Sequence, residues 1–257
     1  MLDRVTITGA DDSVSPVDLL NLSCDFPFVE WGILVSQKKT NTDCPRFPSS
    51  QWIEGLQAIT QATELQLSLH VCGRWVRSLL MGVVTFPTDL LQGFQRVQLN
   101  FHGDRMAYDG DALSETLVAL NRDFIFQLDG VRGNEYLENA EVSRASGLFD
   151  VSGGAGILPR EWPSPVYLDV QPGPDGEGVE QWGYHGYAGG LSPDNLAEQL
   201  PRILKASAGT KHTSEGRIWI DTETRVRSDD DRQFDLAKVR RFLEIAAPYV
   251  GRWGVNA

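Results

Sequence analysis

The sequence has few cysteines and no long apolar segment. Its three cysteines, Cys24, Cys44 and Cys72, are odd in number and widely spaced, and no CxxC pair of the zinc-binding type occurs. This usage favours reduced thiols over a disulfide framework. No stretch approaches about 18 consecutive apolar residues, and the first residues, MLDRVTITGADD, lack the layout of a signal peptide. We therefore expect a soluble cytoplasmic protein.

Positive charge is also scarce. The 257 residues include 23 Lys and Arg against 35 Asp and Glu, which gives a net charge of −12. Such a surplus repels phosphate backbones and anionic lipid head groups, so we expect neither a nucleic-acid partner nor a membrane partner. The apolar share of 41% is ample for a buried core, which excludes disorder of the whole chain.

Short β-rich runs alternate with segments of helical period, which is typical of βα units around a parallel sheet. The expected strands are residues 4–8, 28–35, 65–71, 96–101, 124–128, 147–151, 183–188 and 217–222. Eight such units in a chain near the roughly 250 residues typical of the fold predict an α/β protein with one (β/α)8 barrel, the TIM barrel. We expect a single domain over residues 1–257. The alternative is a doubly wound open sheet.

Helix boundaries agree with this pattern. Ser15-Pro16 and Ser192-Pro193 each place a capping hydroxyl before a proline of the first helical turn. The last helix is indicated by apolar side chains at three- and four-residue spacing, namely Leu236, Val239, Phe242, Leu243 and Ala246.

One stretch, residues 163–178, lacks a helical period and is rich in proline and glycine. We interpret it as an irregular excursion between the sixth and seventh strands. It stands where a sixth helix is expected, so either residues 158–162 form a short helix or the excursion itself covers the strand.

Catalytic groups of such barrels lie where the strands end at their carboxyl side. Asp150 follows the sixth strand, where the alternative role is that of a turn cap. Asp221 and Glu223 are two residues apart on the eighth strand and face the same way, which suits acid–base chemistry. The alternative is a salt bridge to Arg225 or Arg227.

The turn after the seventh strand has the features of an anion site. Gly189 and Gly190 lead directly into the predicted helix, so backbone amides and the helix dipole can hold a phosphate. The alternative is that the two glycines only form a tight turn.

Several motifs together carry a family resemblance. AGGLSPDN (188–195), IDTETRVR (220–227) with FDLAKVRRFLE, LFDVSGGAG (148–156), VQLNFHGD (97–104) and WGILVSQKK (31–39) occur in an order similar to that of the phosphoribosylanthranilate isomerase family. That family consists of ribulose-phosphate-binding (β/α)8 barrels. The resemblance extends over nearly the whole chain, and the first two stretches carry most of it.

The resemblance implies an Amadori-type aldose–ketose isomerisation, as in tryptophan biosynthesis, on a small anionic or phosphorylated sugar derivative. The family's general acid corresponds to Asp150. Its basic cysteine corresponds to Thr8, whose hydroxyl is far too weakly acidic to replace a thiolate. A replacement base is therefore expected among Asp11, Asp12, Glu223 and His70.

The resemblance also implies residues that bind the substrate. Arg46 corresponds to the arginine that meets the substrate carboxylate, and His102, Gly153 and Gly154 lie in matching segments at the mouth. Arg225 replaces a small residue of the phosphate site, so it either binds the anion or blocks it.

We expect an enzyme with a small anionic substrate, no cofactor and no metal, as a monomer or homodimer. One alternative is a barrel that has lost isomerase chemistry and binds a metabolite or a partner protein. The other is a lyase or epimerase that uses Asp221 and Glu223.

Overall fold

The computed structural model describes residues 1–100, 108–128, 145–150, 156–165, 167–168, 181–182, 184–208 and 217–251. Within these residues, parallel strands form a closed barrel in the order β1-β10-β9-β6-β5-β4-β3-β2. The barrel strands are β1 (Leu2–Thr8), β2 (Val29–Ser36), β3 (Gln66–Cys72), β4 (Arg96–Asn100), β5 (Asp123–Leu128), β6 (Ala145–Phe149), β9 (His185–Tyr187) and β10 (Ile218–Thr222).

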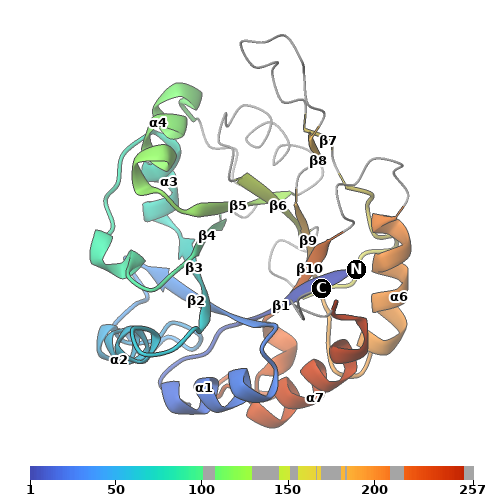
Figure 1. Ribbon diagram of the computed structural model, residues 1–257. Coiled ribbons are helices and arrows are strands. Elements are labelled where there is room, and N and C mark those ends of the chain that lie inside the picture. Colours follow the sequence, from blue (N-terminus) through green and yellow to red (C-terminus); the bar gives the residue numbers. More distant parts are fainter. Residues whose placement is uncertain are drawn as a thin grey trace.

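Helices lie around the outside of the ring of strands (Figure 1). They are α1 (Pro16–Asp25), α2 (Ser50–Thr60), α3 (Arg74–Leu80), α4 (Gly110–Leu120), α6 (Leu196–Ser207) and α7 (Leu236–Ala246), with the 3₁₀ turns η1 (Thr88–Leu91), η2 (Thr224–Val226) and η3 (Ala247–Tyr249). A short antiparallel pair, β7 (Tyr167–Leu168) and β8 (Gln181–Trp182), is separate from the barrel sheet. The alternation of strands with outer helices defines a (β/α)8 barrel.

The predicted barrel is confirmed, and its eight strands are those expected from the sequence. Described strand ends differ from the expected ones by one or two residues, while Phe101, Val151 and Gly183 lie outside the described residues. The open-sheet alternative is wrong because β1 pairs with both β2 and β10 and so closes the ring.

Two predicted helix features are confirmed. The Ser15 hydroxyl accepts a hydrogen bond from the Val17 amide at 3.1 Å, and Asp18 completes the capping box at the start of α1. Helix α7 buries Val239, Phe242, Leu243 and Ala246, the stripe that the spacing predicted. Both helices therefore begin and pack as their sequences dictate.

The helix considered for residues 158–162 is absent, because the described segment 156–165 contains no helix. Pro159 and Pro163 cannot supply the amide hydrogens that a helix needs. Trp162 covers the strand instead: its ring packs edge-on against Tyr187 of β9 with centroids 6.0 Å apart, and its Nε1 donates to Gln199 of α6 at 3.1 Å. The rest of the predicted excursion, apart from β7, lies outside the described residues.

Side chains that alternate along the strands divide into an outer and an inner set. The outer set, with residues such as Ile33, Leu69 and Phe126, forms one large apolar core with the helices. A separate apolar cluster joins Ile125, Leu148, Ala188 and Trp219 with Tyr184 from the later strands. Alternation along β5, β6, β9 and β10 places this smaller cluster inside the barrel.

The side of the barrel interior formed by the first four strands is ionic. Glu30 on β2 is fully buried and accepts hydrogen bonds from Arg4 at 2.9 Å, Thr6 at 2.8 Å and Arg96 at 3.1 Å. Burial opposes ionisation of Glu30, but Arg96, Arg4 and Thr6 outweigh it and lower the pKa of the carboxyl. The Arg96 guanidinium also lies 4.2 Å from the Trp219 ring centroid. Arg96 therefore connects the ionic side of the interior with the apolar cluster that contains Trp219.

Substitution of Glu30 tests that network. We expect Glu30→Gln to lower the free energy of unfolding by about 3 to 5 kcal/mol, because it leaves the buried Arg96 and the partly buried Arg4 without this counter-charge. Urea unfolding followed by tryptophan fluorescence measures this, with Glu54→Gln on the exposed side of α2 as the matched control. The effect is present above the ordinary glutamate pKa of 4.5 and shrinks as the pH falls below it, since the folded-state pKa is lowered. Equal unfolding midpoints for the two variants would contradict the network's role.

Candidate active site

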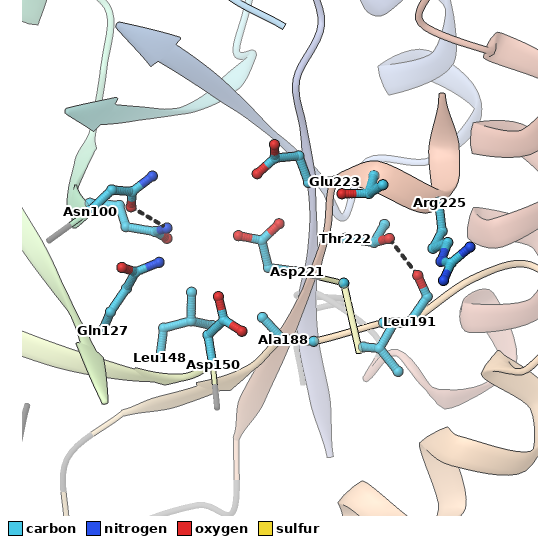
Figure 2. Close-up of a pocket in the computed structure, with 15 residues that line it drawn as sticks. Asn100, Gln127, Leu148, Asp150, Ala188, Leu191, Asp221, Thr222, Glu223 and Arg225 are labelled. Carbon is cyan, nitrogen blue, oxygen red and sulfur yellow. Dashed lines mark hydrogen bonds between the residues drawn. The ribbon is translucent and has the colours of Figure 1, made fainter. Parts of the chain in front are cut away.

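A pocket of about 520 Å³, part of it open to solvent, lies where the barrel strands end at their carboxyl side. Polar and apolar groups share its wall, and Figure 2 shows side chains of both kinds. The lining residues are Gln98, Asn100, Gln127, Leu148, Asp150, Gly156, Ala188, Gly189, Gly190, Leu191, Asp221, Thr222, Glu223, Thr224 and Arg225. This is the place where the sequence predicted the catalytic groups of a barrel.

Three carboxyl groups converge on this pocket, those of Asp150 after β6, Asp221 on β10 and Glu223 just after it. In Figure 2 they face the carboxamides of Asn100 and Gln127 across the pocket. Carboxyl groups can give and take protons, and carboxamides can bind hydroxyl or carbonyl oxygens. The pocket is thus equipped for proton transfer on an oxygen-rich ligand.

Asp221 is the most buried of the three carboxyl groups, with 6% of its surface exposed. The Thr8 hydroxyl donates to its Oδ1 at 2.8 Å. Burial raises the pKa of Asp221 well above its ordinary value, and the nearby carboxylates of Glu223, Glu30 and Asp150 add to the rise against the hydrogen bond from Thr8. Burial and the neighbouring carboxylates therefore favour the protonated form of Asp221 more than in an ordinary aspartate.

The absence of a side chain at Gly32 leaves the space in which Thr8 lies beside His70. A Cβ atom at Gly32 would lie 2.2 Å from Thr8 Oγ1 and 2.9 Å from His70 Nε2, so only glycine leaves room for both side chains. Burial lowers the pKa of His70 to about 3, and its Nε2 is buried without a hydrogen-bond partner among the described residues. His70 is thus a neutral group in the barrel interior.

Glu223 and Arg46 form an ion pair at the rim of the pocket. Arg46 Nη1 donates to Glu223 Oε1 at 2.5 Å, and Arg46 Nε donates to Asp231 at 2.8 Å. Burial disfavours the charged guanidinium, yet hydrogen bonds and charge from Asp231 and Glu223 raise the pKa of Arg46. The arginine that the sequence assigned to a substrate carboxylate is therefore engaged by two carboxylates of the protein itself.

Asp11, a candidate base, is buried in a structural network. It accepts from the Ser13 hydroxyl at 2.6 Å, from the Arg46 amide at 2.8 Å and from Arg227 Nη2 at 2.7 Å. Burial opposes ionisation, but these donors lower the pKa of Asp11. The fully buried Arg227 also donates to Asp231 and to the Gly9 carbonyl, so Asp11 joins the loops after β1, β2 and β10.

The two glycines of the predicted anion turn are required by their surroundings. Gly190 has a φ of +65°, and a Cβ there would lie 2.6 Å from the backbone nitrogen of Leu158. Asn195 fastens the turn by donating to the Gly190 carbonyl at 2.9 Å and by accepting from the Ser192 amide at 2.9 Å. The Ser192 hydroxyl accepts from the Asp194 amide at 3.3 Å, as a cap does, but α6 begins later than predicted, at Leu196 with Asn195 as its N-cap.

Arg225 lies on η2 at the edge of the pocket, and its side chain is exposed. Figure 2 places it beside Leu191, on the far side of Thr222 from Asp221. Thr222 holds this edge by donating to the Leu191 carbonyl at 2.7 Å. Arg225 thus borders the pocket without filling it.

The remaining predicted site residues, His102, Gly153 and Gly154, lie outside the described residues. Sequence reasoning overlooked the amides Gln98 and Gln127, which line the pocket. The sequence feature that marks such a residue is a polar side chain among apolar ones near the end of a strand, as Gln127 is in the run FIFQL.

No group of three or more His, Cys, Asp or Glu side chains suited to a metal ion occurs in the part of the chain that the structure describes. Among the same residues, no helix has both the length and the apolar character needed to cross a membrane.

The closed ring of parallel strands with outer helices places the chain in the class of (β/α)8 barrels, and the comparison with known proteins agrees with this. No protein-family model and no curated protein matches the sequence. Solved structures, in contrast, match over nearly the whole chain.

The phosphoribosylanthranilate isomerase of Thermotoga maritima, solved as monomers generated from the dimeric enzyme, is 16% identical; the match covers 95% of this chain and 98% of that one, with a TM-score of 0.53. A truncated 3-deoxy-D-arabino-heptulosonate 7-phosphate synthase from the same organism is 12% identical, over 96% and 86% of the two chains, with a TM-score of 0.54. A spore coat polysaccharide biosynthesis protein from Bacillus subtilis is 11% identical, over 96% and 68%, with a TM-score of 0.51. At these identities the likeness shows a shared barrel fold and no narrower family.

Cys72 is the thiol nearest to the pocket wall and receives a hydrogen bond from Asn100 at 3.5 Å. Burial raises its pKa to about 12, so we expect Cys72 to resist alkylation at pH 8 while the exposed Cys24 reacts. Mass spectrometry after brief treatment with a maleimide measures this, and the same treatment in urea must label both. Rapid labelling of Cys72 in the folded chain would restore a thiolate as a candidate base.

Proposed function

We propose that this protein is an isomerase that acts on a small anionic sugar derivative at the mouth of the barrel, by an aldose–ketose rearrangement. One observation carries the proposal: the carboxyl groups of Asp150, Asp221 and Glu223 converge on a pocket whose opposite wall is made of carboxamides. An aldose–ketose rearrangement needs one group that gives a proton to oxygen and another that takes a proton from carbon. Neighbouring carboxyl groups in different environments can divide these roles.

The sequence resemblance supports the isomerase class. The motifs shared with the phosphoribosylanthranilate isomerase family include the segments that contribute Asp150, Gly189, Gly190 and Asp221 to the pocket. Two of the structural neighbours are named for phosphorylated compounds, an isomerase and a synthase. We therefore propose a phosphorylated or carboxylated sugar derivative as the substrate, and Asp150 as one of the groups that exchange protons with it.

The anion of the substrate is proposed to bind at the glycine turn. Gly189 has a φ of 111° and Gly190 a φ of 65°, and both line the pocket next to the exposed Arg225. Backbone amides near glycines can approach an anion closely, and an arginine beside them adds a planar set of donors. This division places the anion near η2 and the reacting carbons near the three carboxyl groups.

A second candidate is a barrel that binds a metabolite without converting it. Thr8 stands where the resembled family has its basic cysteine, and Arg46 is paired with Glu223 and Asp231. The first observation removes the family's base, and the second occupies the arginine that would bind the substrate carboxylate. Ligand binding without turnover is therefore the alternative to isomerisation.

The first test is isomerisation of phosphoribosylanthranilate, followed by the loss of its fluorescence. We expect turnover by the wild-type chain, and we expect Asp150→Asn to reduce it at least about 100-fold while leaving ligand affinity within about tenfold, because an isosteric change removes proton transfer alone. Asp229→Asn, at a fully exposed carboxyl group, is the matched control and must turn over like wild type. A wild-type chain that binds the compound without converting it would favour the second candidate.

Substitution of Arg225 tests the anion site. We expect Arg225→Met to raise KM about tenfold or more with little change in kcat, because the lost contact is made equally in the ground state and the transition state. The control is Arg232→Met, which changes another exposed arginine, in the segment between η2 and α7. A change in kcat alone, with KM unaltered, would contradict a purely anion-binding role.

A further inference from the structure

The surroundings of Asp221 give it a specific role in the reaction, and this role rests on the proposed function. Its carboxyl group forms part of the pocket wall, and one of its oxygens, Oδ1, is occupied by the Thr8 hydroxyl at 2.8 Å. This hydrogen bond leaves Oδ2 as the oxygen that can carry a proton. Of the three carboxyl groups, Asp221 is therefore the one that is both buried and held by a hydrogen bond from the neighbouring strand β1.

Negative groups surround Asp221 on several elements. Glu223 comes just after the end of β10, Glu30 lies on β2, and Asp150 follows β6. All three oppose ionisation of Asp221, and burial opposes it further, so the pKa of the carboxyl is raised. Two adjacent carboxylates cannot easily both be charged, which places the proton on the more buried one.

Positive groups near Asp221 are committed elsewhere. Arg96 pairs with Glu30 at 3.1 Å, and Arg46 pairs with Glu223 at 2.5 Å. His70, which lies beside Thr8, is neutral because burial lowers its pKa to about 3. None of the ion pairs formed by the described residues involves Asp221. The charge of an ionised Asp221 would thus be left without a partner inside the barrel.

We propose that Asp221 is the proton donor of the site and that Thr8 is its positioning residue, so that Oδ2 carries the proton toward the substrate. The resemblance assigned the donor role to Asp150. In this proposal Asp150 is the proton acceptor instead. Thr8 fills the place of the family's cysteine without taking over its task, and acts through Asp221.

The proton balance of the rearrangement follows. Asp221 gives its proton to the ring oxygen as the bond from that oxygen to C1 breaks; the electron pair of the bond stays on the oxygen, and a lone pair of the nitrogen or oxygen substituent on C1 forms a double bond to C1. Asp150 then takes the proton from C2, the electron pair left behind forms the C1–C2 double bond, and the π pair of the C1–heteroatom double bond returns to the heteroatom. Asp150 returns its proton to C1, and the C2 hydroxyl gives its proton back to Asp221 as the ketone forms. Both carboxyl groups end as they began, and no oxidant or reductant is needed.

Titration of Asp221 tests the proposal without relying on activity. Nuclear magnetic resonance of protein labelled with ¹³C at the aspartate carboxyl carbons reports each group, and Asp221→Asn identifies the signal by its loss. We expect Asp221 to be neutral at pH 7. An ionised Asp221 at pH 7 overturns the proposal, whatever the turnover.

Variants around Asp221 predict opposite shifts of that titration. Thr8→Val keeps the shape but removes the hydrogen bond that favours the carboxylate, so we expect the pKa of Asp221 to rise, while Thr8→Ser keeps the hydroxyl and should titrate like wild type. Asp150→Asn removes a neighbouring negative charge and should lower the pKa. An unchanged titration in Thr8→Val would overturn the positioning role, and Thr8→Ser provides the comparison if the valine variant does not fold.

Turnover then connects the acid to the reaction. We expect Asp221→Asn to lose at least about 100-fold in kcat, and the alkaline limb of the kcat profile to move to higher pH in Thr8→Val, because proton donation fails only above the pKa of the donor. Turnover of Asp221→Asn equal to wild type would overturn the donor role. A neutral Asp221 in a wild-type chain with no turnover would instead count against the proposed isomerisation, so the two failures are distinguishable.

Discussion

Charge enclosed within a closed ring of strands must be paired or neutralised, and this constraint organises the barrel. In the interior, Glu30 meets the constraint with two cations, Arg4 and Arg96, and remains ionised. One layer nearer the mouth, Asp221 meets a hydroxyl group in place of a cation, and burial raises its pKa, which favours a retained proton. The same physical demand thus yields a structural ion cluster in one layer and an acid in the next.

The arginines of the mouth reinforce this division. Arg227 is fully buried and binds Asp11 and Asp231, while Arg46 binds Glu223 and Asp231. These pairs join three loops that come from distant parts of the chain and fix the rim on which the pocket depends. Neither of these two guanidinium groups pairs with Asp221. Their placement therefore fixes the rim and leaves the raised pKa of Asp221 without compensation from them.

Much of the fold was predictable because each strand is a short apolar run whose neighbours in sequence are its neighbours in space. The site was predictable only in position: strand ends located Asp150, Asp221 and Glu223, but their partners were not readable. Thr8 and Asp221 are 213 positions apart, and Arg46 and Glu223 are 177 apart. Such contacts arise from closure of the barrel and from loop packing, which local periodicity does not encode.

The residue at position 8 illustrates how one side chain sets the roles of its neighbours at the mouth of the barrel. A thiol there can become a nucleophilic base but is a weak hydrogen-bond donor, whereas a hydroxyl is a firm donor and no base. With threonine, the group at position 8 stabilises one oxygen of Asp221 and leaves the other toward the pocket. In the mechanism we propose, position 8 therefore supplies no base: Asp221 is the acid, and Asp150, which lines the same pocket, accepts the proton from carbon.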